Sequence, residues 1–419
     1  MRLCRTSFLA ALLGSAFALT ALTPAVGANV SRDDLKRIRA VQGNHLGGLQ
    51  PRSRGASGLG RANATYAVMH DFAGAPNDGA NSGADLRLDR LGNIYGTTNY
   101  GGSANFGALF KIAPDGTETL LHSFGIGNDG STPDGGVTIN QSTGDLYGTT
   151  ESGGSSGNGV IWKLAADGTY TVLHDFSAND GSFIRGRMIR DTVGNFYGTA
   201  LFGGANGDGT VFKYGFDGSF KVLHTFNGSD GEFPEHGVIR DRAGNLYGVT
   251  AFGGTNDEGT VFKIAADGTF TTLYNFTGQA DGGFLYGGLD RDNDNNLYGS
   301  TVGGGAHGMG TVFKVAPDGT ETVLYSFTGG ADGGSPEGDM LFVGKKLYSA
   351  AIGGGDPNCQ CGVVYQVNTS GKETVLHSFT GTDGSGYSAG LVKSEHVFYG
   401  TTSSGGAHGD GVVFSVTKK

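Results

Sequence analysis

The chain has 419 residues, a formal net charge of −10, 80 glycines and three cysteines. So much glycine would be typical of a disordered or collagen-like chain if it had no longer pattern, but here the glycines recur with a long period. Residues 65–419 carry 20 basic and 37 acidic side chains, a net charge of −17, and such a surface excludes nucleic acid and anionic membranes as expected partners.

Residues 1–28 have the layout of a cleavable secretory signal peptide. Arg2 and Arg5 precede an uncharged apolar run from Phe8 to Leu22, and small residues follow up to Ala28. The alternative is a retained membrane anchor, but the run is shorter than the ~20 apolar residues that a spanning helix needs. We expect cleavage, no membrane insertion, and secretion to the extracellular space or the periplasm.

Residues 29–64 are predicted to form a flexible basic arm. They contain seven basic and two acidic side chains and show almost no apolar periodicity. A segment of this composition buries too little apolar surface to offset the entropy lost on ordering. The folded domain is therefore expected to span residues 65–419.

This domain consists of seven copies of a unit of about fifty residues. The phrase "YGTT", or a close variant, begins at Tyr95, Tyr147, Tyr197, Tyr247, Tyr298, Tyr348 and Tyr399. A short apolar run and an Asp turn precede it, and the phrases "GTVFK" and "VLHSF" follow it, joined by an Asp-Gly hairpin. Four short antiparallel strands per unit, which we name a to d in this order, predict an all-β, seven-bladed β-propeller.

The two ends of the repeat region complement each other. The first strand, Tyr66 to Phe72, matches strand d and has no a, b or c before it, whereas the chain ends in a strand c at Val412 to Thr417. We expect the N-terminal strand to join the last blade and so remove an open sheet edge.

The copy from Gly244 to Phe276, "GNLYGVTAFGGTNDEGTVFKIAADGTFTTLYNF", resembles the Gloeobacter–Verrucomicrobia tandem repeat of "choice-of-anchor" surface proteins. The likeness covers residues 66–419, and the unit is also similar to NHL-type blades. The resemblance implies an extracellular propeller and no defined activity.

Several repeated features are interpreted as structural. Histidines recur at one position of strand d. Because strand d is the outermost strand of every blade, its seven copies are spread around the ring, so these side chains cannot converge on one metal ion. An Asp-Gly pair recurs in each d-to-a loop, where an Asx turn is expected and a bound cation is the alternative. Cys359 and Cys361 lie in one b-to-c loop, where a tight disulfide, free thiols and a weak metal site all stay open. The sequence identifies no cofactor and no metal site.

Function is best sought where the copies differ. The d-to-a and b-to-c loops emerge on one face, which we call the top face. Five residues beyond each loop aspartate, the side chains should ring the top mouth of the central channel: Gly83, Asp134, Arg185, Glu235, Tyr286, Glu337 and Ser388. Two residues further come Asp85, Gly136, Arg187, Gly237, Gly288, Asp339 and Gly390.

Blades 3 to 5, counted from the first strand a, differ most from the others. Their d-to-a loops carry Phe183, Phe233 and Phe284, and the b-to-c loops of blades 3 and 4 carry Phe202 and Phe252. His236 replaces a glycine or alanine of every other copy. Aromatic platforms beside charged groups are typical of sites for sugars or extended polymers. The alternative is that these aromatics only cover blade edges.

Two functional hypotheses follow. The first is a monomeric binding protein for an extracellular carbohydrate or peptide, with these five phenylalanines, Arg187, Glu235 and Glu337 as ligand-binding residues. The second is a polysaccharide-degrading enzyme. A uronic-acid lyase needs a cation, a base and an acid, and Arg185 with Arg187, His236 and Tyr286 offer these chemistries. A glycoside hydrolase would instead use two carboxylates, for instance Glu235 and Glu337.

Overall fold

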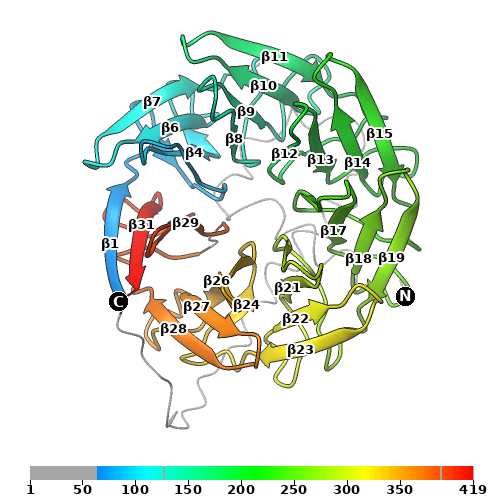
Figure 1. The fold of residues 1–419 in the computed structure, drawn as a ribbon. Coiled ribbons are helices and arrows are strands. Elements are labelled where there is room, and N and C mark those ends of the chain that lie inside the picture. Colours follow the sequence, from blue (N-terminus) through cyan, green and yellow to red (C-terminus); the bar gives the residue numbers. More distant parts are fainter. Residues whose placement is uncertain (1–63, 126–127, 387–388, 419) are drawn as a thin grey trace, which may run out of the picture. The chain divides into compact units, whose positions relative to one another are not determined.

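The computed structural model describes residues 64–125, 128–386 and 389–418, and the predicted signal peptide and nearly all of the basic arm lie outside this part of the chain. The regular structure of the described residues is entirely β (Figure 1). Seven sheets surround a central axis, with strand a innermost and strand d outermost in each blade. The predicted seven-bladed β-propeller is confirmed.

The strands of each blade follow one another in the chain. Blade 1 contains β3 (Arg87–Leu88), β4 (Ile94–Thr98), β6 (Ala108–Ile112) and β7 (Glu118–Ser123). Blade 2 contains β8 (Val137–Ile139), β9 (Leu146–Thr149), β10 (Val160–Leu164) and β11 (Tyr170–Asp175). Blade 3 contains β12 (Ile189–Arg190), β13 (Phe196–Ala200), β14 (Thr210–Tyr214) and β15 (Phe220–Thr225). Blade 4 contains β16 (Ile239–Arg240), β17 (Leu246–Thr250), β18 (Thr260–Ile264) and β19 (Phe270–Asn275).

The last three blades follow the same plan with small variations. Blade 5 contains β20 (Asp290–Arg291), β21 (Leu297–Thr301), β22 (Thr311–Val315) and β23 (Glu321–Ser326). Blade 6 has an additional short strand, and contains β24 (Gly334–Pro336), β25 (Leu341–Val343), β26 (Lys346–Gly353), β27 (Val363–Asn368) and β28 (Glu373–Ser378). Blade 7 contains β29 (Val392–Ser394), β30 (Val397–Thr402), β31 (Val412–Lys418) and the N-terminal strand β1 (Ala64–Asp71).

Strand β1 closes the ring, as predicted. It runs antiparallel to β31, with Val68 opposite Phe414. Tyr66 also reaches blade 6, because its ring stacks on His377 with centroids 3.7 Å apart and its hydroxyl donates to the carbonyl of Asp383 at 2.5 Å. The first strand of the domain therefore joins the last two blades.

Aromatic side chains pack between neighbouring blades. The strand c aromatics and the phenylalanines that end strand d are almost fully buried, and Phe226 of blade 3 packs edge-on against Phe262 of blade 4 at 5.3 Å. The glycine of "YGTT" makes room for the strand c ring: a Cβ on Gly248 would lie 2.5 Å from Cζ of Phe262. The repeated phrases thus encode one packing unit.

The repeated histidines of strand d contact the repeated aspartates of the d-to-a loops. His122 Nε2 lies 3.1 Å from a carboxylate oxygen of Asp129, and the imidazole stacks on Tyr170 of the next blade at 4.1 Å. In blade 5, Tyr325 replaces the histidine and donates to Asp332 at 2.8 Å. These contacts support the interpretation that both residues are structural.

Contacts between loops fix the top face. In every blade the d-to-a loop and the b-to-c loop pair in a short antiparallel arrangement. β2 (Gly79–Ala80) pairs with β5 (Tyr100–Gly101) in blade 1, β24 pairs with β26 in blade 6, and single bridges such as Glu232 with Phe252 occur in the other five. In the b-to-c loop of blade 6, Cys359 and Cys361 form a disulfide, which is one of the three alternatives that the sequence left open. The two loop types therefore share one face, as the sequence predicts.

Candidate functional site

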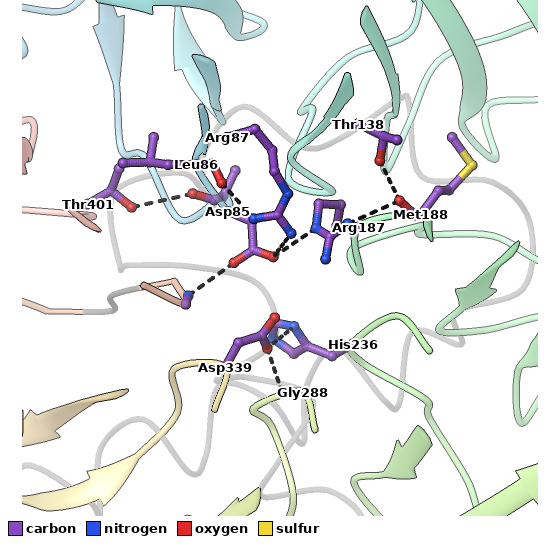
Figure 2. Close-up of polar contacts among 12 residues, drawn as sticks. Asp85, Leu86, Arg87, Thr138, Arg187, Met188, His236, Gly288, Asp339 and Thr401 are labelled. Carbon is purple, nitrogen blue, oxygen red and sulfur yellow. Dashed lines mark hydrogen bonds and ion pairs between the residues drawn. The ribbon is translucent and has the colours of Figure 1, made fainter. Parts of the chain in front are cut away.

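Charged side chains from several blades meet near the propeller axis. Figure 2 shows Asp85 and Arg87 of blade 1, Arg187 of blade 3, His236 of blade 4 and Asp339 of blade 6 pointing toward one another. We call these five residues the Arg187 cluster. Arg187 Nε lies 3.3 Å from Asp85 Oδ2, and Arg87 Nη2 lies 3.7 Å from the same oxygen. His236 Nδ1 lies 2.8 Å from Asp339 Oδ1.

Backbone groups complete the Arg187 cluster. The amide of Gly390 in blade 7 donates to Asp85 at 3.1 Å, and the amide of Gly288 in blade 5 donates to Asp339. Both carboxylates are therefore paired with a cation and with a backbone N–H group.

These contacts control protonation in the Arg187 cluster. Burial lowers the pKa of His236, but the charges of Asp339 and Asp85 outweigh it and raise this pKa to about 9. Burial raises the pKa of Asp339, but the charge and hydrogen bond of His236 outweigh it, so the pKa of Asp339 is well below its usual range. At neutral pH the two residues form an ion pair, and His236 is not free to act as a base.

A second cluster surrounds Arg185 of blade 3, and we call it the Arg185 cluster. Its Nε lies 2.5 Å from Glu151 Oε1, and its Nη1 lies 2.7 Å from Glu235 Oε1. Asp134 Oδ2 is 3.9 Å from the same Nε. The cluster thus joins blades 2, 3 and 4, and the charge of Arg185 is already matched by carboxylates.

Tyr286 of blade 5 and Glu337 of blade 6 interact electrostatically with the Arg185 cluster. Burial, followed by the charges of Glu235 and Glu337, raises the pKa of the Tyr286 hydroxyl well above its usual value. Burial, followed by the charge of Glu235, raises the pKa of Glu337 to about 8. Glu337 therefore holds a proton at neutral pH.

Glycine allows the blades to approach so closely at the axis. A Cβ on Gly186 would lie 1.9 Å from the backbone nitrogen of Gly237, and a Cβ on Gly237 would lie 2.2 Å from the carbonyl oxygen of Arg187. The backbones of blades 3 and 4 are therefore in direct contact. Any other residue at these two positions would force the blades apart.

The five loop phenylalanines form one continuous row on the top face. Successive ring centroids are 5.4, 5.2, 5.9 and 5.3 Å apart, from Phe183 through Phe202, Phe233 and Phe252 to Phe284. The rings meet mainly edge to face, which is a favourable arrangement for aromatic pairs. Phe252 is buried, and the other four are half-buried.

Three of these phenylalanines have an unfavourable backbone conformation. Phe183, Phe233 and Phe284 have φ of 57°, 56° and 62°, in the left-handed region that bulky residues avoid. The same loop position has positive φ in the other four blades, where it holds small or polar residues: Asn81, Thr132, Ser335 and Gly386. The loop geometry therefore imposes this conformation. The free-energy cost of holding three phenylalanines in it must be offset by packing or by a ligand.

The structure brings most of the predicted site residues together. Arg185 and Glu235 form an ion pair in the Arg185 cluster. The charges of Glu235 and Glu337 act on Tyr286, and Phe233 is only two residues from Glu235 in one loop. Arg187 and His236 belong instead to the Arg187 cluster. His408, in the b-to-c loop of blade 7, lies 3.3 Å from Asp71 at the end of the outermost strand β1.

Sequence reasoning missed Glu151 and Arg87. Glu151 is 7% exposed and is part of the Arg185 cluster through its ion pair with Arg185. Its signal was an acidic residue at a b-to-c loop position that holds an apolar residue in blades 3 to 6: Leu201, Ala251, Val302 and Ile352. Arg87 carried a weaker signal, because it lies in strand a beyond the ring positions.

A small cavity lies on the opposite face between blades 4 and 5. Its volume is about 220 Å³, and its lining includes Asp241, Tyr247, Lys263 and Leu297. Tyr247 donates to Asp241 at 3.1 Å, and the equivalent bond recurs between Tyr197 and Asp191. The lining of the cavity therefore includes a repeated structural contact, and it contains no predicted site residue.

Comparisons with known proteins agree with the repeat and the fold. The profile of the Gloeobacter/Verrucomicrobia repeat matches residues 53–242 and 234–419. No curated protein matches the chain.

Solved structures share the propeller fold at low sequence identity. The chain is similar to streptogramin B lyase, with a TM-score of 0.57 and 11% identity, covering 84% of this chain and 98% of that one. It is also similar to the extracellular domain of BT4673 from B. thetaiotaomicron, with a TM-score of 0.53 and 14% identity over 84% of this chain and 40% of that one. For puromycin hydrolase the TM-score is 0.50 and the identity 13%, over 76% of this chain and 50% of that one. At these identities the likeness concerns the fold alone. Within the described residues, no helix is long and apolar enough to cross a membrane.

Proposed function

We propose that this chain, which belongs to the Gloeobacter/Verrucomicrobia repeat family, is a secreted protein that binds an extracellular carbohydrate on its top face over blades 3 to 5. The observation that carries the proposal is the row of five phenylalanines beside the Arg185 cluster. Secretion rests on the signal peptide predicted for residues 1–28.

The row offers what a sugar polymer needs for affinity. Pyranose rings stack their C–H faces on aromatic rings, and the four half-buried phenylalanines leave part of their surface open to solvent. Phe183, Phe233 and Phe284 hold the left-handed loop position in three consecutive blades, each at a cost of about 1–3 kcal/mol. A binding role explains why bulky residues occur where glycine or asparagine would be less strained.

The neighbouring polar groups would orient a bound sugar. Carboxylates of Glu235 and Asp134 accept hydrogen bonds from sugar hydroxyls, and the buried contacts to Arg185 fix their positions before a ligand arrives. A rigid polar group next to an aromatic surface is a common arrangement in carbohydrate sites.

A glycoside hydrolase is the second candidate, and one observation favours it. Glu337 holds a proton at neutral pH because its pKa is raised to about 8, whereas Arg185 keeps Glu235 in an ion pair. A protonated carboxylic acid near an ionised one is the pair that glycoside hydrolysis uses. The lyase hypothesis receives less support, because His236 is paired with Asp339 and the charge of Arg185 is already matched.

The test is an oligosaccharide binding screen followed by substitution. A variant with Phe183, Phe233 and Phe284 all changed to alanine should bind at least about tenfold more weakly than the unaltered chain. Phe216→Ala is the matched control, because Phe216 is 71% exposed and lies in the hairpin between β14 and β15, on the opposite face. Full binding by the triple variant would contradict the placement. Release of reducing sugar that Glu337→Gln abolishes would favour the hydrolase.

A further inference from the structure

The net charge of the propeller lies in the loops of its top face. The d-to-a and b-to-c loops together contain 19 acidic and two basic side chains, and the rest of residues 65–419 contains 18 of each. The loops therefore account for the whole net charge of the domain, −17. Burial raises the pKa values of Glu151, Glu235 and Glu337, but leaving these three acids out still gives the loops an excess of 14 negative charges.

The two basic side chains of these loops are already matched by carboxylates. Arg185 forms ion pairs with Glu151 and Glu235, and Arg187 forms one with Asp85. The loops contain no lysine. An anionic group on the top face would therefore meet a negative field and no arginine or lysine that lacks a carboxylate partner.

Acidic residues also lie directly beside the phenylalanine row. The backbone carbonyl of Asp208 accepts a hydrogen bond from the amide of Phe233 at 2.9 Å, and the carbonyl of Glu258 accepts one from the amide of Phe284 at 2.9 Å. Both acidic side chains are half-buried, so part of each reaches solvent. Since charges act over about 8 Å at physiological ionic strength, a ligand on the row lies within the field of these two carboxylates.

This arrangement repels anions but does not form a binding site for a cation. The seven repeated loop aspartates each accept a hydrogen bond from a backbone amide of their own loop. Among the residues that the structure describes, no group of three or more acidic, histidine or cysteine side chains is arranged to hold a metal ion. Repulsion needs only a field, whereas selective binding of a cation needs carboxylates that converge on it.

The charge of the loops thus bears on which carbohydrate the row accepts. Stacking of a sugar on phenylalanine does not require a charged group, whereas like charges facing each other at an interface reject a ligand. Resting on the proposed function, we propose that the carbohydrate is uncharged, and that the acidic top-face loops, Asp208 and Glu258 foremost, exclude anionic polysaccharides such as uronic-acid polymers. Asp208 and Glu258 act here through their charge and not by contact with the sugar.

The experiment compares pentamers that differ only in one exocyclic group, a hydroxymethyl or a carboxylate. The pairs are glucose with glucuronic acid and mannose with mannuronic acid, all β-1,4-linked, at neutral pH. Each pentamer competes with a fluorescently labelled neutral pentamer for the mature chain. Competition is measured because residues 29–64 carry seven basic side chains, which attract an anionic pentamer away from the site. The anionic member of a pair should compete at least about tenfold more weakly than the neutral one.

Salt provides a second measurement. Raising sodium chloride from about 0.01 M to about 1 M shortens the Debye length from about 30 Å to about 3 Å. Competition by the anionic pentamers should then become stronger, because the repulsion is screened, whereas that of the neutral pentamers should change little. A preference that comes from shape alone would not depend on salt in this way.

Substitutions locate the charge effect. A variant with Asp208→Asn and Glu258→Gln should raise the affinity of the anionic pentamer relative to the neutral one by about three- to tenfold. The matched control carries Asp267→Asn and Asp318→Asn, which remove the same charge from exposed positions in the hairpins of blades 4 and 5 on the opposite face. This control should leave the ratio of affinities unchanged, and thermal unfolding checks that both variants are folded.

The outcomes separate this inference from the proposed function. Equal or stronger competition by the anionic pentamers would overturn the inference and leave carbohydrate binding in place, and so would stronger competition by a glucosamine pentamer, whose free amino groups are cationic. An equal change in the ratio for the two double variants would overturn the assignment to Asp208 and Glu258. Binding of no oligosaccharide, neutral or charged, would overturn both the inference and the proposed function.

Discussion

Deletion of strand β1 should prevent the propeller from closing. A chain that begins at Ala64 retains β1, whereas a chain that begins at Gly74 lacks it and also lacks Phe72, which is fully buried. Loss of a buried phenylalanine side chain costs about 3–5 kcal/mol. The deletion also removes the ladder of seven residue pairs with β31, at about 0.5–1.5 kcal/mol for each hydrogen bond. The total is comparable to the whole stability of a typical domain, about 5–15 kcal/mol.

The assay is thermal unfolding with size-exclusion chromatography of both truncated chains. The chain from Ala64 should unfold cooperatively and elute as a single species. The chain from Gly74 should unfold at a much lower temperature or aggregate, because β31 then presents an open edge. A synthetic peptide of residues 64–73 should partly restore the transition by pairing with that edge. Equal unfolding temperatures for the two chains would refute closure by β1.

Three further predictions concern single residues. His236→Gln should remove a pH dependence of the free energy of unfolding. The pKa of His236 is about 9 in the folded chain and 6.5 in the unfolded one. Its ion pair with Asp339 therefore contributes its full stabilisation below pH 6.5. The free energy of unfolding of the unaltered chain should therefore fall by up to about 3 kcal/mol as pH rises through 9, and equal pH profiles for the two proteins would contradict this. Gly186→Ala should destabilise the domain by at least about 1–3 kcal/mol in denaturant titration, because the added Cβ would lie 1.9 Å from the nitrogen of Gly237. His224, the repeated strand d histidine of blade 3, lies 3.1 Å from the loop aspartate Asp230. His224→Ala should lower the unfolding temperature without changing oligosaccharide affinity, and an altered affinity would argue against its purely structural role.

The fold was predictable because each repeated phrase specifies a local packing unit. The glycine of "YGTT" is needed under the strand c ring, as at Gly248 below Phe262, and the strand d histidine needs the loop aspartate, as at His122 and Asp129. Such short-range requirements are visible in the residues themselves. Seven repeats of them then determine the ring.

The site was only partly predictable, because its contacts cross between blades. Counting from the loop aspartates brought Arg185, Glu235 and Glu337 to the axis, but it did not identify their partners. Asp85 of blade 1 reaches Arg187 of blade 3 at 3.3 Å, past blade 2. This contact depends on how closely the backbones approach at the axis, and a single copy of the repeat contains no information about that distance.

The phenylalanines illustrate a second limit. Their positions in the loops were predicted, but not the edge-to-face row or the left-handed φ of Phe183, Phe233 and Phe284. The turn chemistry of the other copies, with Asn81 and Gly386 at the same position, carried the signal for this conformation. It was hidden because phenylalanine is an unusual choice there.

The two clusters at the axis differ in role: the Arg187 cluster is structural, and the Arg185 cluster is the one proposed to take part in recognition. In the Arg187 cluster each carboxylate meets a cation and a backbone N–H group, so these contacts join six blades and leave no carboxylate for a ligand. The Arg185 cluster is fixed beside it, since Arg185 and Arg187 belong to one loop, but two of its buried carboxylate oxygens have no hydrogen-bond partner in the part of the chain that the structure describes. A fully paired cluster that fixes the backbone next to one that keeps unsatisfied carboxylate oxygens is the arrangement expected of a preorganised site, because binding then costs little reordering of the loops. The departures from sevenfold symmetry therefore concentrate where a ligand would gain most from a rigid surface.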